Sequence, residues 1–153
     1  MEEWRGNRFK TECLPLVRPF SAVPNLLRRA RDAGLRIAIA SSAKKDELDK
    51  YLDIAHIAGL VDLTTSSDDV EKSKPAPDFF EIVLKKLKIE GADAVAIGDT
   101  PYDAAAAQKA GIATIGVLCG GFIESLLRQA GCVEIYPGPA TLFACFGNSL
   151  LAR

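Results

Sequence analysis

The sequence lacks the groupings of cysteine and histidine that bind metals or build disulfide frameworks. There is one histidine, His56, in a segment that is typical of a packed or surface imidazole. No apolar run reaches the length of a membrane span, and the first residues contain no apolar segment of a secretion signal. Four scattered cysteines form no Cys-x-x-Cys pair: Cys13, Cys119, Cys132 and Cys145. These absences predict reduced thiols in a cytoplasmic protein that does not cross a membrane.

The sequence also lacks an excess of charge of either sign. Nineteen lysines and arginines stand against 20 aspartates and glutamates, so the formal net charge is -1. No strong field therefore favours nucleic acid or an anionic membrane, and we expect neither as a partner. The 153 residues, 48% of them hydrophobic, suffice for the core of one domain, which we place at residues 1–153.

Short apolar runs alternate with longer amphipathic stretches along the chain. This alternation is typical of a parallel sheet covered by helices, and it predicts a three-layer α/β/α Rossmann-like fold. The predicted strands are residues 35–40, 61–65, 94–97, 112–117 and 133–136. The predicted helices are residues 23–33, 45–52, 79–87, 102–110 and 123–129, with a weaker one at 141–151. In such sheets ligands bind at the carboxyl ends of the strands, so those positions are where a site is expected.

The first such position is the segment from Gly98 to Asp103, directly after an apolar strand. Asp99 lies at the strand end, and Asp103 falls on the first turn of the helix that begins at Pro101. Two neighbouring carboxylates repel each other unless a hard divalent ion lies beside them, which indicates a magnesium site. The alternative is structural: Asp99 caps the helix, and Asp103 favours the positive end of its dipole.

The second position is Ser41-Ser42, which follows the strand ending at Ala40. Hydroxyl groups and free backbone N–H groups at the start of a helix bind phosphate well. The alternative is that a serine merely caps the helix that begins near Lys45.

The third position is Lys74, which precedes Pro75 in a proline-rich turn. Proline restricts the residue before it to extended conformations, so the lysine ammonium can be aimed at a phosphoryl group or a carboxylate. The alternative is a solvated lysine in an ordinary turn.

In order and spacing, these features resemble the second, third and fourth motifs of haloacid dehalogenase-like hydrolases. The motifs correspond to Ser41-Ser42, to the segment from Lys74 to Asp78, and to the segment from Gly98 to Asp103. An alanine-rich helix ending at Gly111 follows, as in that family. The sequence is most similar to the phosphoglycolate phosphatase and β-phosphoglucomutase-like branch, over residues 17–144.

The resemblance implies a phosphatase that acts on a small phosphorylated metabolite through an aspartyl-phosphate, with Mg²⁺ as cofactor. Ser41 and Ser42 would bind the phosphoryl group, and Lys74 would stabilise the nucleophile and the transferring charge. Asp99 would bind Mg²⁺. Asp103 would bind it through water or orient Lys74, and Thr100 would support the loop.

One part of the family pattern has no counterpart in the sequence. The first motif is a strand followed by Asp-x-Asp, which supplies the nucleophile and the general acid and base. Asp68-Asp69 and the segment from Asp46 to Asp49 have the wrong spacing or setting. The chain is therefore expected to begin after the first strand and the cap domain. It would be incomplete at the central strand of the sheet, inactive alone, and open to self-association through an unpaired edge.

Two other interpretations remain open at this point. The chain could be a non-catalytic protein that keeps a phosphate and magnesium half-site for binding or regulation. It could also be an ordinary α/β domain in which the three motifs coincide by chance.

Overall fold

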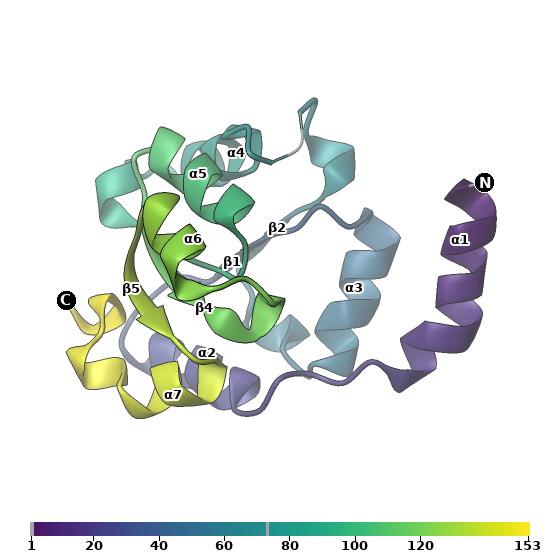
Figure 1. The fold of residues 1–153 in the computed structure, drawn as a ribbon, viewed down its shortest axis with the longest axis horizontal. Helices are drawn as coiled ribbons and strands as arrows, with labels where there is room; N and C mark the ends of the chain where they lie inside the picture. The colour runs from purple at the N-terminus through teal and green to yellow at the C-terminus, as the bar shows by residue number, and fades with distance from the viewer. Residues whose placement is uncertain (1, 73) are drawn as a thin grey trace.

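The computed structural model describes residues 2–72 and 74–153, in which helices surround short parallel strands (Figure 1). The five strands are β1 Ala38–Ala40, β2 Leu63–Thr65, β3 Val95–Gly98, β4 Ala113–Val117 and β5 Cys132–Tyr136. The seven α-helices are α1 Glu2–Arg8, α2 Val23–Asp32, α3 Lys45–Ile54, α4 Asp78–Leu87, α5 Pro101–Lys109, α6 Glu124–Gln129 and α7 Pro139–Ala144. A π-helical segment, Phe9–Cys13, and several short 3-10 turns complete the described chain.

The strands form two separate parallel sheets, which we call the two-stranded and three-stranded half-sheets. In the first, β1 pairs with β2, and Ala38 lies opposite Leu63. In the second, the order is β3-β4-β5, and Ile97 lies opposite Ile115. Within the described part of the chain, no ladder joins β1 to β3. The predicted parallel α/β fold is confirmed, and its described strands fall into two small parallel sheets.

Helices cover both faces of the half-sheets, which gives three layers. On one face, Ile115 of β4 packs with Leu26 of α2 and Leu142 of α7. On the other face, Ala96 of β3 packs with Ala107 of α5, and Phe80 and Leu84 of α4 pack against them. Ile115 and Leu142 on the first face are fully buried, as are Phe79 of α4 and Thr65 of β2.

The first strand is shorter than the sequence predicts. The prediction was residues 35–40, whereas β1 contains only Ala38–Ala40 and Leu35 is 38% exposed. The backbone N–H of Ile37 donates to the Asp62 carboxylate at 2.7 Å, so a side chain occupies the place where a longer ladder would continue. Arg31 donates to the other Asp62 oxygen at 2.9 Å and ties α2 to the same point.

The predicted C-terminal helix over residues 141–151 is wrong in extent. Helix α7 begins earlier, at Pro139, because proline at the first position of a helix has a suitable φ and lacks only an N–H that would be unpaired there. It ends at Ala144, and two 3-10 turns follow, Phe146–Asn148 and Leu150–Ala152. Gly147 and Asn148 favour such a break, since both have low helix propensity.

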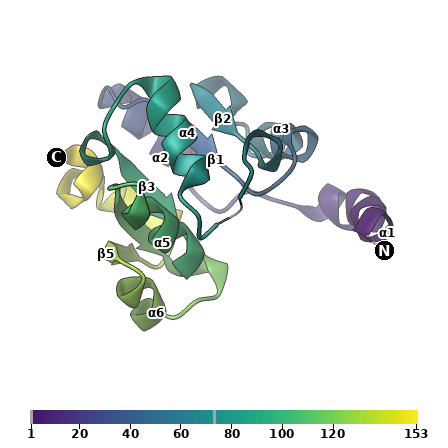
Figure 2. The same cartoon turned by 90° about the horizontal axis from the view of Figure 1, so that it is seen from above.

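The N-terminal helix stands apart from the other helices in both views (Figures 1 and 2). Its following segment is tied to α3 by Lys10, which donates to Asp46 at 3.1 Å. Trp4 is 64% exposed, and the Arg8 guanidinium lies over its ring. Across the described residues, no helix combines the length and the apolar character needed to cross a membrane.

Candidate active site

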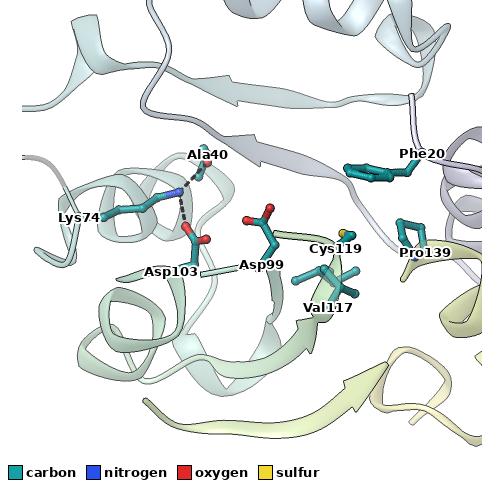
Figure 3. Close-up of a pocket in the computed structure, with 10 residues that line it drawn as sticks. Phe20, Ala40, Lys74, Asp99, Asp103, Val117, Cys119 and Pro139 are labelled. Atoms are coloured by element: carbon teal, nitrogen blue, oxygen red, sulfur yellow. Dashed lines mark hydrogen bonds and ion pairs between the residues drawn. The ribbon is translucent and has the colours of Figure 1, made fainter. Parts of the chain in front are cut away.

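The loop after β3 presents Asp99 at the carboxyl end of the three-stranded half-sheet. Thr100 is the N-cap of α5, and its hydroxyl accepts a hydrogen bond from the Asp103 N–H at 3.1 Å. The alternative that Asp99 caps the helix is therefore wrong. Among the described residues, the Asp99 carboxylate has no hydrogen bond or ion pair, and its side chain faces a cavity (Figure 3). It is thus available to a ligand.

Asp103 is held from two sides on the first turn of α5. Lys74 Nζ donates to its Oδ1 at 2.6 Å, and the Thr100 hydroxyl donates to its Oδ2 at 2.7 Å. The side chains of Lys74 and Asp103 are only 16% and 13% exposed, so this pair is largely desolvated. Gly98 allows the approach, because a Cβ at that position would lie 2.6 Å from the Asp103 Cβ.

Lys74 bridges the two half-sheets. Besides Asp103, its ammonium donates to the main-chain oxygen of Ala40, at the end of β1, at 3.1 Å (Figure 3). It also lies 5.5 Å from the centroid of the Phe79 ring and 5.8 Å from that of Phe80, within the range of cation–π attraction. The alternative of a solvated lysine in a turn is therefore wrong, since the side chain is fixed by four neighbours.

The turn after β4 supports Asp99 from behind. A Cβ at Gly120 would lie 2.7 Å from the Asp99 Cβ and 2.5 Å from its main-chain oxygen, so only glycine fits there without displacement. Cys119 lies in the same turn and lines the cavity. Burial, and then the nearby Asp99 carboxylate, raise the pKa of the Cys119 thiol. The Cys119 thiol is therefore protonated at neutral pH.

The serines after β1 lie beside this group without lining its cavity. The Ser41 hydroxyl accepts a hydrogen bond from the Ala43 N–H at 3.1 Å, and the Ser41 N–H donates to Thr65 O at 2.9 Å. The N-cap of α3 is Lys44, so neither serine caps that helix. Ser42 is exposed to solvent. The Ser41 hydroxyl hydrogen has no acceptor among the described residues and is free to be donated.

The cavity of about 290 Å³ spans both half-sheets at the carboxyl ends of their strands. Lys74, Asp99 and Asp103 were singled out in the sequence, and the structure brings all three to its wall. Phe20 and Cys119, which also line the cavity, were not predicted as site residues. Phe20 belongs to the segment before α2 and lies across the cavity from Lys74 (Figure 3). The turn that contains Cys119 and Gly120 was visible in the sequence as the glycine turn that follows a strand in the family it resembles.

The charges of the site favour a cation. One lysine faces two aspartates, which leaves one negative charge without a partner, and that charge lies on Asp99. The described residues contain no group of three or more histidine, cysteine, aspartate or glutamate side chains that could enclose a metal ion. Any metal at Asp99 would therefore need further oxygen ligands from water, substrate or another carboxylate.

Sequence comparison places the chain among hydrolases. The profile of the haloacid dehalogenase-like hydrolase family matches residues 1–117, which extends to the N-terminal helix. A phosphoglycolate phosphatase of Aquifex aeolicus is 32% identical over 106 residues, 67% of this chain and 48% of that protein. A pyrophosphatase PpaX of Bacillus velezensis is 28% identical over 102 residues, 67% of this chain and 47% of that protein. The chain spans about half the length of these curated relatives.

Structural comparison gives the same fold. A hydrolase from Pseudomonas syringae superposes with a TM-score of 0.88 and 24% identity, over 96% of this chain and 68% of that one. A haloacid dehalogenase family hydrolase from Deinococcus radiodurans, with bound phosphate and sodium, superposes with a TM-score of 0.85 and 24% identity, over 98% and 68%. With the strand-end motifs and the matched profile, these likenesses settle the ancestry: the chain belongs to the haloacid dehalogenase-like hydrolase family.

Proposed function

We propose that the cavity is the phosphate and Mg²⁺ half of an aspartate-based phosphatase site for a small phosphorylated metabolite. The free Asp99 carboxylate beside the desolvated Lys74–Asp103 pair is the observation that carries this proposal. A cation ligand and a fixed ammonium at one edge of a parallel sheet are the groups needed to hold a phosphate dianion. The names of the relatives, a phosphoglycolate phosphatase and a pyrophosphatase, support this class of substrate.

The residues present fit Mg²⁺ only in part. Mg²⁺ binds through one or two carboxylates together with water and phosphate oxygens, and Asp99 would supply one such carboxylate. Both Asp103 oxygens already accept hydrogen bonds, from Lys74 and Thr100. We therefore assign Asp103 to orienting Lys74, with any contact to the metal made through water. When bound, Mg²⁺ would neutralise charge on the phosphoryl oxygens.

Three side chains would act on the phosphoryl group itself. The free hydroxyl hydrogen of Ser41 would be donated to a phosphoryl oxygen, and Ser42 would add its hydroxyl or backbone N–H from the same turn. Lys74 has three N–H donors, of which two are occupied by Asp103 and Ala40. The third would be directed to the phosphoryl oxygens or to an attacking carboxylate.

The chemistry of an aspartyl-phosphate needs a carboxylate nucleophile that no Asp-x-Asp in this sequence supplies. Asp99 is assigned to the metal and Asp103 is engaged with Lys74, so neither is free to attack. We therefore propose that this chain alone binds phosphate with Mg²⁺ and does not turn over phosphate esters. Its four free cysteines are consistent with a reducing compartment, and we propose the cytoplasm.

The test is calorimetric titration of inorganic phosphate into the chain with and without Mg²⁺. We expect binding that requires Mg²⁺ and is lost in Asp99→Asn, because the amide cannot replace an anionic ligand. Asp93→Asn is the matched control, since Asp93 is an exposed aspartate in the turn before β3, and it should bind like the wild type. Absence of Mg²⁺-dependent binding in the wild type would contradict the proposal.

A parallel assay with an aryl phosphate and Mg²⁺ tests the second part. We expect no turnover by the wild type or either variant. Turnover that disappears in Asp99→Asn would show that the chain completes a catalytic site by itself, and the proposed inactivity would be wrong.

A further inference from the structure

Two aromatic residues form a pair on the side of the candidate site that carries Asp99. Tyr102 lies on the first turn of α5, three positions after Asp99. Its ring meets the ring of Phe122 edge to face, with 6.3 Å between the ring centroids and an interplanar angle of 89°. A T-shaped contact of this kind favours one orientation of both rings.

The turn after β4 connects this pair to Asp99. Gly120 lies so close to Asp99 that a Cβ on the glycine would be 2.7 Å from the Asp99 Cβ. Gly121 then adopts a left-handed conformation with a φ of 84°, which glycine tolerates and which directs the chain toward α5. The same short turn therefore contacts Asp99 through Gly120 and the Tyr102 ring through Phe122. The Tyr102 ring is thus placed beside the carboxylate that faces the cavity.

The two rings differ in burial. Phe122 packs against Ala104 and Leu127, which are fully buried on α5 and α6, two helices that lie side by side (Figures 1 and 2). Tyr102 is 55% exposed, and its hydroxyl group has no hydrogen bond to any described residue. Its ring is therefore supported by one neighbour and otherwise open, so it is available to stack on a ligand.

The surface around Tyr102 is uncharged. Pro101, Tyr102 and residues 118–123 include no lysine, arginine, aspartate or glutamate. Ile123, the neighbour of Phe122, is 64% exposed and extends the apolar surface. Such a surface cannot compensate a second charged group of a ligand for its lost water, whereas an uncharged flat group gains by covering it.

We propose that Tyr102 is a specificity residue of the site and stacks on the uncharged, planar organic group of a phosphate monoester. This inference rests on the proposed function, because the phosphoryl group must be held near Asp99 and Lys74 for the organic group to lie on the ring. It narrows the substrate class to monoesters whose organic group has a flat face and no second charge.

The test compares two esters that carry the same phosphate group, phenyl phosphate and methyl phosphate, by calorimetric titration into the full chain with Mg²⁺. We expect the wild type to bind phenyl phosphate about fivefold more tightly, which corresponds to an aromatic contact of about 1 kcal/mol. Tyr102→Ala should abolish this preference, whereas Tyr102→Phe, which keeps the ring, should preserve it. Trp4→Ala is the matched control and should also preserve it, since Trp4 is an exposed aromatic residue on the separate N-terminal helix.

The outcomes separate this inference from the proposed function. Equal binding of the two esters by the wild type would overturn the role of Tyr102 and leave the proposed function standing. A preference that survives in Tyr102→Ala would overturn it as well. Loss of the preference in Tyr102→Phe would show that the hydroxyl group and not the ring makes the contact, and so would also overturn it. Absence of Mg²⁺-dependent binding of both esters would contradict the proposed function, and the inference would fall with it.

Discussion

The two half-sheets differ in how completely they are packed. In the three-stranded half, Ile115 is fully buried and Thr114 is 1% exposed, with helices on both faces. In the two-stranded half, all three residues of β1 are partly exposed, although Thr65 at the end of β2 is fully buried. Ile115 of β4 is thus more deeply buried than the residues of β1, whereas Val95 and Ile97 of β3, the strand that leads to Asp99, are 36% and 43% exposed. In the two-stranded half, α3 packs against Ile39, and α4 contacts both strands.

The largest expected effect comes from removing a core side chain of the three-stranded half. Ile115→Ala should lower the free energy of unfolding by about 2–5 kcal/mol, because it leaves a cavity in close-packed surroundings. Ile39→Ala, in the partly exposed β1, should cost roughly 1 kcal/mol. Urea unfolding followed by circular dichroism measures both. Equal losses of unfolding free energy in the two variants would show that Ile115 and Ile39 are equally well packed.

A smaller effect is expected at the contact that joins the halves. Lys74→Met leaves Asp103 desolvated without its cation and should destabilise the chain by roughly 3 kcal/mol. Lys45→Met is the matched control, because Lys45 pairs with Asp49 on the exposed side of α3 and should change stability by less than about 0.5 kcal/mol. If the two lysine variants unfold at the same urea concentration, the Lys74 contacts between the half-sheets do not contribute measurably to the free energy of unfolding.

The smallest effect concerns the two-stranded half and depends on pH. The Ile37 N–H, and then Arg31, lower the pKa of Asp62 from its ordinary value of 3.8. A carboxylate whose pKa is lower in the folded chain than in the unfolded chain stabilises the fold. This contribution is complete at pH values above the unfolded pKa, and it is lost as the pH falls through the folded pKa. Asp62→Asn should therefore be less stable than the wild type at pH 7, and the difference should shrink below pH 3.8. Melting temperatures of both proteins, measured from pH 7 to below pH 3.8, test this, and a difference that does not change with pH would contradict it.

Much of the fold was predictable because periodicity and strand-end chemistry are local. The strands at Ala38–Ala40 and Val95–Gly98 follow from short apolar runs, whereas the pairing of Lys74 with Asp103 was expected only from the family resemblance. The sequence contains no Asp-x-Asp strand, and the interruption of the sheet expected from that absence agrees with the two separate sheets of the described residues.

The rest depended on contacts between distant segments. The Asp62 carboxylate accepts a hydrogen bond from the Ile37 N–H and so ends β1 early. A local sequence pattern cannot predict a hydrogen bond between residues 25 positions apart. Gly120 fits behind Asp99 only because two loops meet, and Phe20 reaches the cavity from outside the predicted elements. The roles of Ser41, Asp99 and Asp103 toward phosphate and Mg²⁺ stay predictions, since geometry alone gives their positions.

The exposed position of Trp4 limits the use of tryptophan fluorescence for measuring the unfolding of this protein. It is the one tryptophan of the sequence, and it is 64% exposed on a helix that stands apart from the sheets. Its indole is largely in water in the folded chain already, so its emission should lie near that of free tryptophan and change little when the sheets unfold. Intrinsic fluorescence would report the N-terminal helix, and a flat fluorescence trace would say nothing about the two halves of the site.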